Sequence, residues 1–137
     1  MKKSILAFIL GLVVWAVVAS LVNRGLRIGV SGYAAAEHSL DFTLGMKIAR
    51  LLMAALASVA AGASAGKITV WGTRVAWVIG AALLMVFVPV HVQLWPKFPV
   101  WYHLTFLVTL APLVVLGASL TQTRTVGSSS RISEALH

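Results

Sequence analysis

The sequence predicts an all-α fold, an integral membrane four-helix transmembrane bundle, on three observations. Apolar residues make up 60% of the 137 positions, charged residues only 10%, and the mean hydropathy is +0.97. Soluble domains are roughly half apolar and a quarter charged. Long segments with few charges recur along the chain, and one of them carries small residues at helical spacing. Lipid is therefore the expected solvent of this chain.

Four segments are long enough to cross a bilayer, because about 20 helical residues span a hydrocarbon core of about 30 Å. The predicted spans are residues 4–22, 42–66, 75–95 and 100–120. The second span is the least regular, since Lys47 and Arg50 interrupt its beginning. The first also has the basic start and small residues of a secretory signal cleaved after Ala19. We favour a retained helix, because three further spans need an antiparallel partner.

The remaining segments are more polar or less regular. Residues 23–41 are too long for a tight turn and too apolar for a free linker, so we expect an interfacial loop along the headgroup layer. Either Ser39 or Asp41 is expected to cap the second span. After residue 120 the sequence becomes rich in Ser and Thr, which predicts a flexible polar tail over residues 121–137. Residues 1–120 are then one transmembrane domain.

Small residues indicate how the spans associate. Membrane helices pack through small residues that let their backbones approach, because lipid supplies no hydrophobic driving force between them. The second span has such residues at every fourth position, with further alanines beside them. We expect this helix at the centre of the bundle, in contact with at least two others. The four packing residues are Ala54, Ser58, Gly62 and Gly66.

The stretch HVQLWPKFPVWYH, residues 91–103, predicts a helical hairpin. A residue before proline resists the α conformation, so Pro96 and Pro99 should end the third span near Trp95 and start the fourth at Val100. The rings of this stretch then lie at the depth that Trp and Tyr prefer at a membrane interface. The cluster is thus explained largely by the turn.

Two histidines of the hairpin, His91 and His103, stand at similar depth on adjacent spans and form a candidate polar or cofactor site with Gln93. Two imidazoles can ligate a haem or a metal or contact a quinone. Equal depth does not show that the two histidine side chains face each other, and the sequence places no third ligand nearby. Hydrogen bonding to backbone or water is the favoured interpretation, and a contact with another chain is the remaining one. We expect no cofactor and no metal.

A second candidate constellation gathers charges near the start of the second span. Ionisable groups deep in a span are costly and are usually functional, whereas near an end they snorkel to lipid phosphate. The favoured interpretation is snorkelling or ion pairing, and the alternative is an anion or headgroup site at the mouth of the bundle. The candidate anion or lipid headgroup contacts are Arg24, Arg27, Lys47 and Arg50, and their candidate partners are Glu37 and Asp41.

The net charge of +8 comes from basic residues that stand singly or in pairs near the span ends, so the expected partner is anionic lipid headgroups and not nucleic acid. The N-terminus, the loop of residues 67–74 and the tail carry six of the eleven Lys and Arg, which narrowly favours both termini in the cytoplasm. The sequence has no cysteine, no carboxylate between the span ends and no phosphate-binding loop. We therefore expect no enzyme.

The segments HVQLWPKFPVWYHLTFL and SGYAAAE resemble parts of small uncharacterised bacterial inner-membrane proteins of four spans. The resemblance covers about half of the chain and implies location and architecture, without an activity, a substrate or a catalytic residue. The expected function is a structural or accessory subunit of the inner membrane, acting as a homo-oligomer or within a larger membrane complex. A small oligomeric channel or transporter is the alternative, and a haem- or quinone-binding redox subunit is the third.

Overall fold

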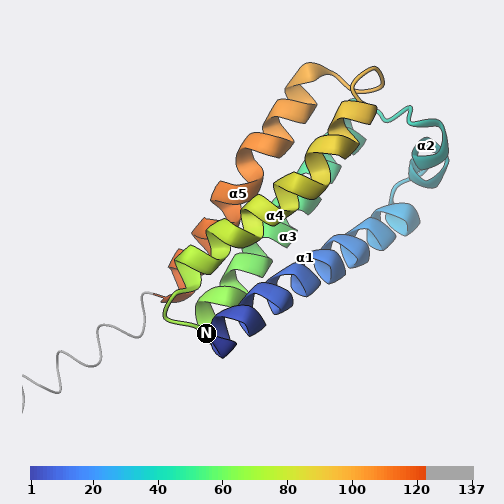
Figure 1. The fold of residues 1–137 in the computed structure, drawn as a ribbon. Coiled ribbons are helices and arrows are strands. Elements are labelled where there is room, and N and C mark those ends of the chain that lie inside the picture. Colours follow the sequence, from blue (N-terminus) through green and yellow to red (C-terminus); the bar gives the residue numbers. More distant parts are fainter. Residues whose placement is uncertain (123–137) are drawn as a thin grey trace, which may run out of the picture.

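The computed structural model describes residues 1–122 and is helical through most of that range (Figure 1). Four helices in this range are long and apolar enough to cross a membrane, which confirms the predicted all-α transmembrane bundle. The predicted tail lies outside the described residues from residue 123 onward. In chain order the helices are α1 (Lys2–Gly29), α2 (Tyr33–Ser39), α3 (Leu44–Ile68), α4 (Gly72–Gln93) and α5 (Val100–Gln122).

The helix boundaries differ from the predicted spans where a helix continues beyond the end of its apolar segment. Helix α1 continues past Val22 to Gly29, because Asn23, Arg24 and Arg27 are polar yet compatible with a helix. At the other end of the bundle, α5 continues to Gln122. The Thr121 hydroxyl there donates to the Ala63 carbonyl oxygen at 3.2 Å. The first two residues of the predicted tail are therefore part of the bundle.

The predicted interfacial loop contains helix α2, flanked by Gly32 and Leu40 in the left-handed conformation with φ of 79° and 64°. Glycine adopts this conformation without steric cost. The expectation that Ser39 or Asp41 caps the next helix is wrong. Thr43 is the N-cap of α3, and its hydroxyl accepts from the Met46 N–H at 3.3 Å. The cap position follows the actual helix start, which lies later than predicted.

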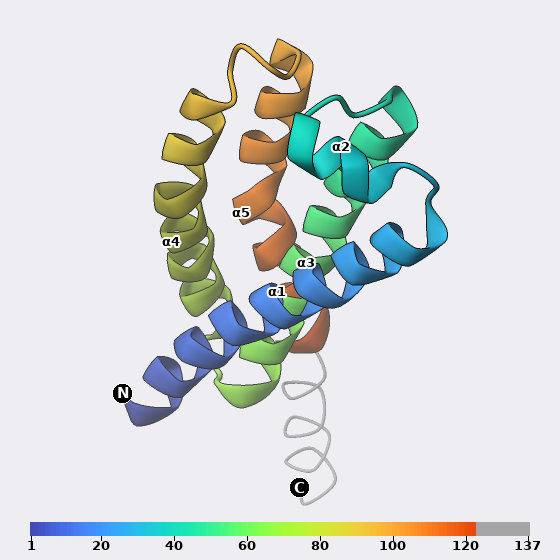
Figure 2. The ribbon, with the colours of Figure 1, turned by 90° about the vertical axis from the view of Figure 1, so that its right-hand side faces the viewer.

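The long helices run alternately up and down the bundle. The N-terminus, the α3–α4 turn and the end of α5 lie together at one end, which we call the terminal end (Figure 1). Helix α2 and the α4–α5 turn lie at the opposite end, the cap end (Figure 1). Figure 2 shows α1 running obliquely across the bundle while α3 stands between it and α5. Helix α3 packs most extensively against α5 and α1, as expected of a central helix.

Glycines bring the backbones of α3 and α5 into direct contact along a line that we call the seam. A β-carbon added to Gly62 would overlap the carbonyl oxygen of Val114, and one added to Gly117 would overlap that of Val59. Gly66 meets the backbone of Ala118 in the same way. Ala54, Ser58 and Gly62 are buried. The small-residue pattern of the sequence therefore lies at a helix interface.

Glycines also allow α1 and α4 to pack closely within the bundle. Gly11 of α1 lies against Ile79, and Gly80 of α4 lies against Ala111 of α5. The Trp15 indole N–H of α1 donates to the Ser58 hydroxyl at 3.1 Å, and this hydroxyl donates to its own helix at the Ala54 carbonyl. Outside these contacts the long helices expose large apolar side chains on the surface that faces lipid, among them Ile5, Val13, Val17, Leu52, Leu56, Val78, Met85, Leu104 and Val108.

Candidate functional site

A polar cluster at the cap end joins α1, α2, α3 and α5, and Glu37 of α2 stands at its centre. The Asn23 side-chain amide donates to Glu37 Oε1 at 2.9 Å, and Arg27 Nε donates to Oε2 at 2.5 Å. An Arg50 terminal nitrogen lies 3.8 Å from Oε1. Glu37 is only partly exposed, so these contacts replace the water that its charge would otherwise need. Helix α2 is thereby fixed to α1 and α3.

Arg50 enters the bundle instead of snorkelling to the surface. One terminal nitrogen donates to the Tyr33 hydroxyl at 3.0 Å, and Nε donates to the Tyr102 hydroxyl at 3.4 Å. The guanidinium also lies 4.8 Å from the centroid of the Phe42 ring. Arginine is suited to such a position because its planar group combines several donors with a face that stacks on rings. We call Asn23, Arg27, Tyr33, Glu37, Arg50 and Tyr102 the cap cluster.

Tyr33 connects the charged and neutral parts of the cap cluster. Its side chain is fully buried, and its hydroxyl donates to the side-chain oxygen Oδ1 of Asn23 at 2.9 Å while it accepts from Arg50. Burial raises the pKa of Tyr33, an effect that the nearby Arg50 charge opposes. The neutral phenol is therefore the form that the cap cluster holds at neutral pH, and its proton is used in the bond to Asn23.

The structure gathers only part of the predicted charged constellation. Arg27, Glu37 and Arg50 meet, whereas Asp41 is exposed and Lys47 makes no ion pair within the described residues. Asn23, Tyr33 and Tyr102 belong to the cluster although the charge pattern does not predict them. Helical continuation of α1 past residue 22 is the signal for Asn23, since it places Asn23 and Arg27 one turn apart on one face.

The two histidines of the hairpin face each other across α4 and α5. Their Nδ1 atoms lie 2.7 Å apart, and both side chains are buried. The Trp95 ring stacks on His103 at 4.8 Å between centroids, and Phe106 lies 4.5 Å from His91. Gln93 is exposed on α4 and does not join them. The two imidazoles bond to each other at Nδ1, and not to the backbone as the favoured interpretation proposes.

The His91–His103 contact has the geometry of a direct hydrogen bond. A metal ion binds each imidazole nitrogen at about 2.0–2.1 Å, so two ligand nitrogens of one ion stand more than about 3 Å apart. A spacing of 2.7 Å leaves no room for an ion between them. The described residues also contain no group of three or more His, Asp or Glu side chains arranged to hold a metal. As placed, these residues do not fit a metal or a haem iron.

The unpartnered nitrogen of this pair favours one tautomer. His103 Nε2 is buried without a hydrogen-bond partner. A buried N–H without an acceptor loses a full hydrogen bond, so we assign the proton of His103 to Nδ1, where it is donated to His91 Nδ1. His91 then carries its proton on Nε2. The pair ties the ends of α4 and α5 together through the Nδ1–Nδ1 hydrogen bond.

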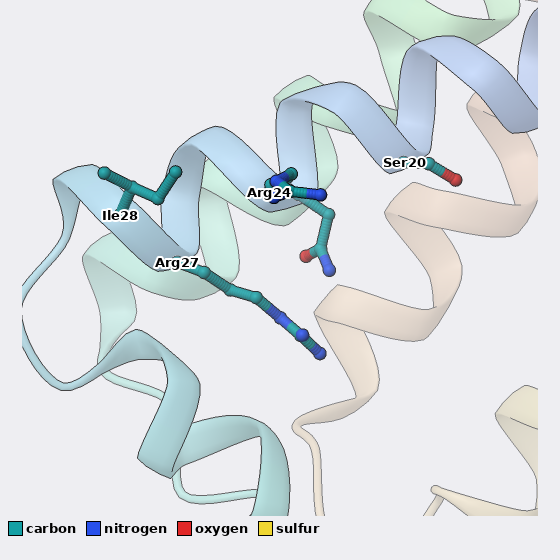
Figure 3. Close-up of a pocket in the computed structure, with 5 residues that line it drawn as sticks. Ser20, Arg24, Arg27 and Ile28 are labelled. Carbon is teal, nitrogen blue, oxygen red and sulfur yellow. The ribbon is translucent and has the colours of Figure 1, made fainter.

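A groove on the flank of α1 lies beside the cap cluster (Figure 3). One part has a volume of about 480 Å³ and follows α1 from Ser20 to Ile28, with Arg24 and Arg27 on its wall. A second part of about 270 Å³ is lined by residues of α1, α2, α3 and α4, including Trp15, Phe87 and the charged groups Glu37 and Arg50. Both arginines that the sequence predicts as headgroup contacts on α1 therefore border this groove.

Comparison with known proteins adds no family to these observations, since no family model, curated protein or solved structure matches the chain. The class of the protein follows from the structure. Four long apolar helices with outward-facing aliphatic side chains define a multi-pass membrane protein.

Proposed function

We propose that this protein is a small integral protein of the bacterial inner membrane with a structural or accessory role and no catalytic activity of its own. The observation that carries the proposal is the direct backbone contact between the helices α3 and α5. At the seam even a methyl group on Gly62 would overlap the α5 backbone, which leaves no passage between α3 and α5. We infer that the bundle interacts with other molecules through its surface and not through a pathway between α3 and α5.

The chemistry of the cap cluster supports a non-catalytic role. A catalytic carboxylate needs a free proton or a reacting atom within hydrogen-bond reach. Both oxygens of Glu37 accept from Asn23 or Arg27, and Arg50 stands beside one of them. Charged groups committed to each other in this way hold helices together.

The charge distribution supports cytoplasmic termini. The terminal end carries Lys2, Lys3, Lys67 and Arg74, and the sequence continues to Arg124 and Arg131. At the cap end, Arg50 is bound within the cap cluster and contributes little to the surface charge. The excess of basic residues at the terminal end is therefore larger than the sequence count indicates, which favours this end on the cytoplasmic side.

Purification from native membranes tests the accessory role. The full chain, tagged at its C-terminus and extracted in mild detergent, is expected to bring down a stoichiometric partner or a second copy of itself. Native mass spectrometry of the eluted complex gives its composition. Recovery of a monomer alone, from membranes crosslinked before extraction as well as from untreated ones, would contradict the proposal.

A channel or transporter formed by several copies is the second candidate function, and one observation favours it. The part of the groove between α1 and α4 places Glu37 and Arg50 on the wall of an opening in the side of the bundle. A second copy packed on this side would enclose those charges. Ion flux in proteoliposomes that stops when Glu37 is replaced by Gln would favour this function over the accessory role.

A further inference from the structure

The groove beside α1 consists of two adjoining hollows that differ chemically. Ser20 and Asn23 border both the part that follows α1 toward Ile28 and the part that reaches inward to α3 and α4, so the two parts meet at these residues. Figure 3 shows Ser20, Arg24 and Arg27 following one another along α1, with the Arg27 side chain extending from the helix. We call the first part the basic half and the second the inner half.

The basic half carries the unpaired positive charge of Arg24 beside the ion-paired Arg27. Arg24 is exposed and makes no hydrogen bond or ion pair within the described residues. Arg27 gives its Nε–H to Glu37, and its side chain remains 55% exposed. Among residues 1–122, Glu37 is the only acidic side chain on the wall of either half, against three arginines. The groove therefore attracts an anion.

The inner half is suited to a hydrocarbon chain. Trp15 and Phe87 stand on its wall with ring centroids 5.0 Å apart, and Met53 and Ala19 lie beside them. Trp15 precedes Asn23 by eight residues, which is about 12 Å along a helix. In a membrane the apolar wall thus begins below the arginines, at the depth of acyl chains, while the arginines lie at the depth of headgroups.

We propose that this groove binds an anionic phospholipid of the leaflet at the cap end. The phosphate contacts Arg24 and the free guanidinium nitrogens of Arg27, with the Asn23 and Ser20 side chains at the junction of the two halves. One acyl chain lies along Trp15, Met53 and Phe87. A soluble anion would use only the basic half, whereas a phospholipid uses both the basic half and the apolar wall below it. The site is independent of the accessory role, because it lies within one copy of the chain.

Native mass spectrometry of the full chain in detergent tests the site. The protein is exchanged into equal amounts of phosphatidylglycerol and phosphatidylethanolamine with identical acyl chains. Both lipids present a phosphate, but the ammonium group of phosphatidylethanolamine offsets its charge. We therefore expect retained phosphatidylglycerol to exceed phosphatidylethanolamine about fivefold, which is the preference that one arginine near a membrane surface gives for a net negative lipid. Arg24→Gln should remove most of this preference. Lys97→Gln is the matched control, because Lys97 is an exposed basic residue of the α4–α5 turn at the same end.

Two further measurements distinguish a bound phospholipid from a bound soluble anion. Ala19→Phe fills the inner half and should lower phosphatidylglycerol retention without changing any charge. Glycerophosphoglycerol, which has the headgroup without acyl chains, should compete weakly. Equal lipid preference in wild type and Arg24→Gln would overturn the proposal, as would an equal loss in Lys97→Gln. Full competition by the free headgroup would show a soluble-anion site instead. Arg24 is exposed and makes no hydrogen bond or ion pair within the described residues, so we expect the fold of Arg24→Gln to remain intact.

Discussion

The seam and the cap cluster hold their helices in opposite ways. At the seam Gly62, Gly66 and Gly117 have no side chain, and the backbones of α3 and α5 touch. At the cap end the side chains are large, and Arg50 reaches Tyr33 and Tyr102 through hydrogen bonds. Without water to drive association, a membrane protein gains contact either by close approach of backbones or by pairing buried polar groups. An added side-chain atom at the seam is therefore expected to destabilise the bundle. In the cap cluster the destabilising change is the loss of a hydrogen-bonding side chain.

The largest expected effect is at the seam. Gly62→Ala adds a methyl group that overlaps the Val114 carbonyl oxygen, so α3 and α5 must separate along several contacts. We expect the free energy of unfolding to fall by about 3 kcal/mol, at the upper end of overpacking costs. The measurement is reversible unfolding in mixed detergent micelles with increasing SDS.

Gly25→Ala is the matched control, because an added β-carbon at Gly25 would have nothing within 4 Å. Alanine is the better helix former, so this variant should be more stable by about 0.5–1 kcal/mol. Equal effects of the two substitutions would show that the backbones do not touch at the seam.

The next effect is expected in the cap cluster. Arg50→Met keeps an unbranched chain but leaves the buried Tyr102 hydroxyl without its guanidinium partner and Glu37 with less positive charge nearby. We expect a loss of about 2 kcal/mol in the free energy of unfolding. Lys47→Met, on the same helix, changes the same charge at a residue without an ion pair in the described range and should stay within about 0.5 kcal/mol. Similar losses in both variants would mean that net charge, and not the cap contacts, matters.

The histidine pair gives a smaller effect that a double-mutant cycle can isolate. His91→Phe or His103→Phe leaves one buried imidazole without its partner and should cost about 1 kcal/mol. Replacing both removes the orphaned group, so the double variant should be more stable than the sum of the single losses predicts. Additive losses would argue against the direct Nδ1–Nδ1 hydrogen bond.

The seam is predictable from the sequence, and the cap cluster only in part. Small residues at every fourth position define a helix face without any knowledge of the partner, which is why the pattern places Ala54, Ser58 and Gly62 at an interface. Hydropathy, however, marks where a helix leaves the lipid and not where it ends, so it predicts an end of α1 at Val22. The continuation of α1 to Gly29 is what brings Asn23 and Arg27 to Glu37.

The sequence pattern does not determine how each helix is rotated about its axis or where the chain folds back. The depth of His91 and His103 follows from their distance to Lys97, but their mutual facing depends on how α4 and α5 are rotated in the bundle. The position of Glu37 depends on a reversal of the chain at Gly32, whose φ is 79°. Many loops of the same composition would leave Glu37 at the surface, so only the assembled structure shows that α2 folds back over the bundle.

The smallest expected effect is a pH dependence that arises from Tyr33. Because burial raises its pKa above the ordinary 10.0, the folded protein holds this proton more tightly than the unfolded chain. The stability that depends on the proton is complete below pH 10 and is lost as pH rises through the folded pKa. The wild-type free energy of unfolding should therefore fall more steeply above pH 10 than that of Tyr33→Phe, measured in the same micelles. Arg50 attracts the phenolate and limits the size of this difference. Parallel slopes for the two proteins would show that the Tyr33 hydroxyl is not held in the buried bond to Asn23.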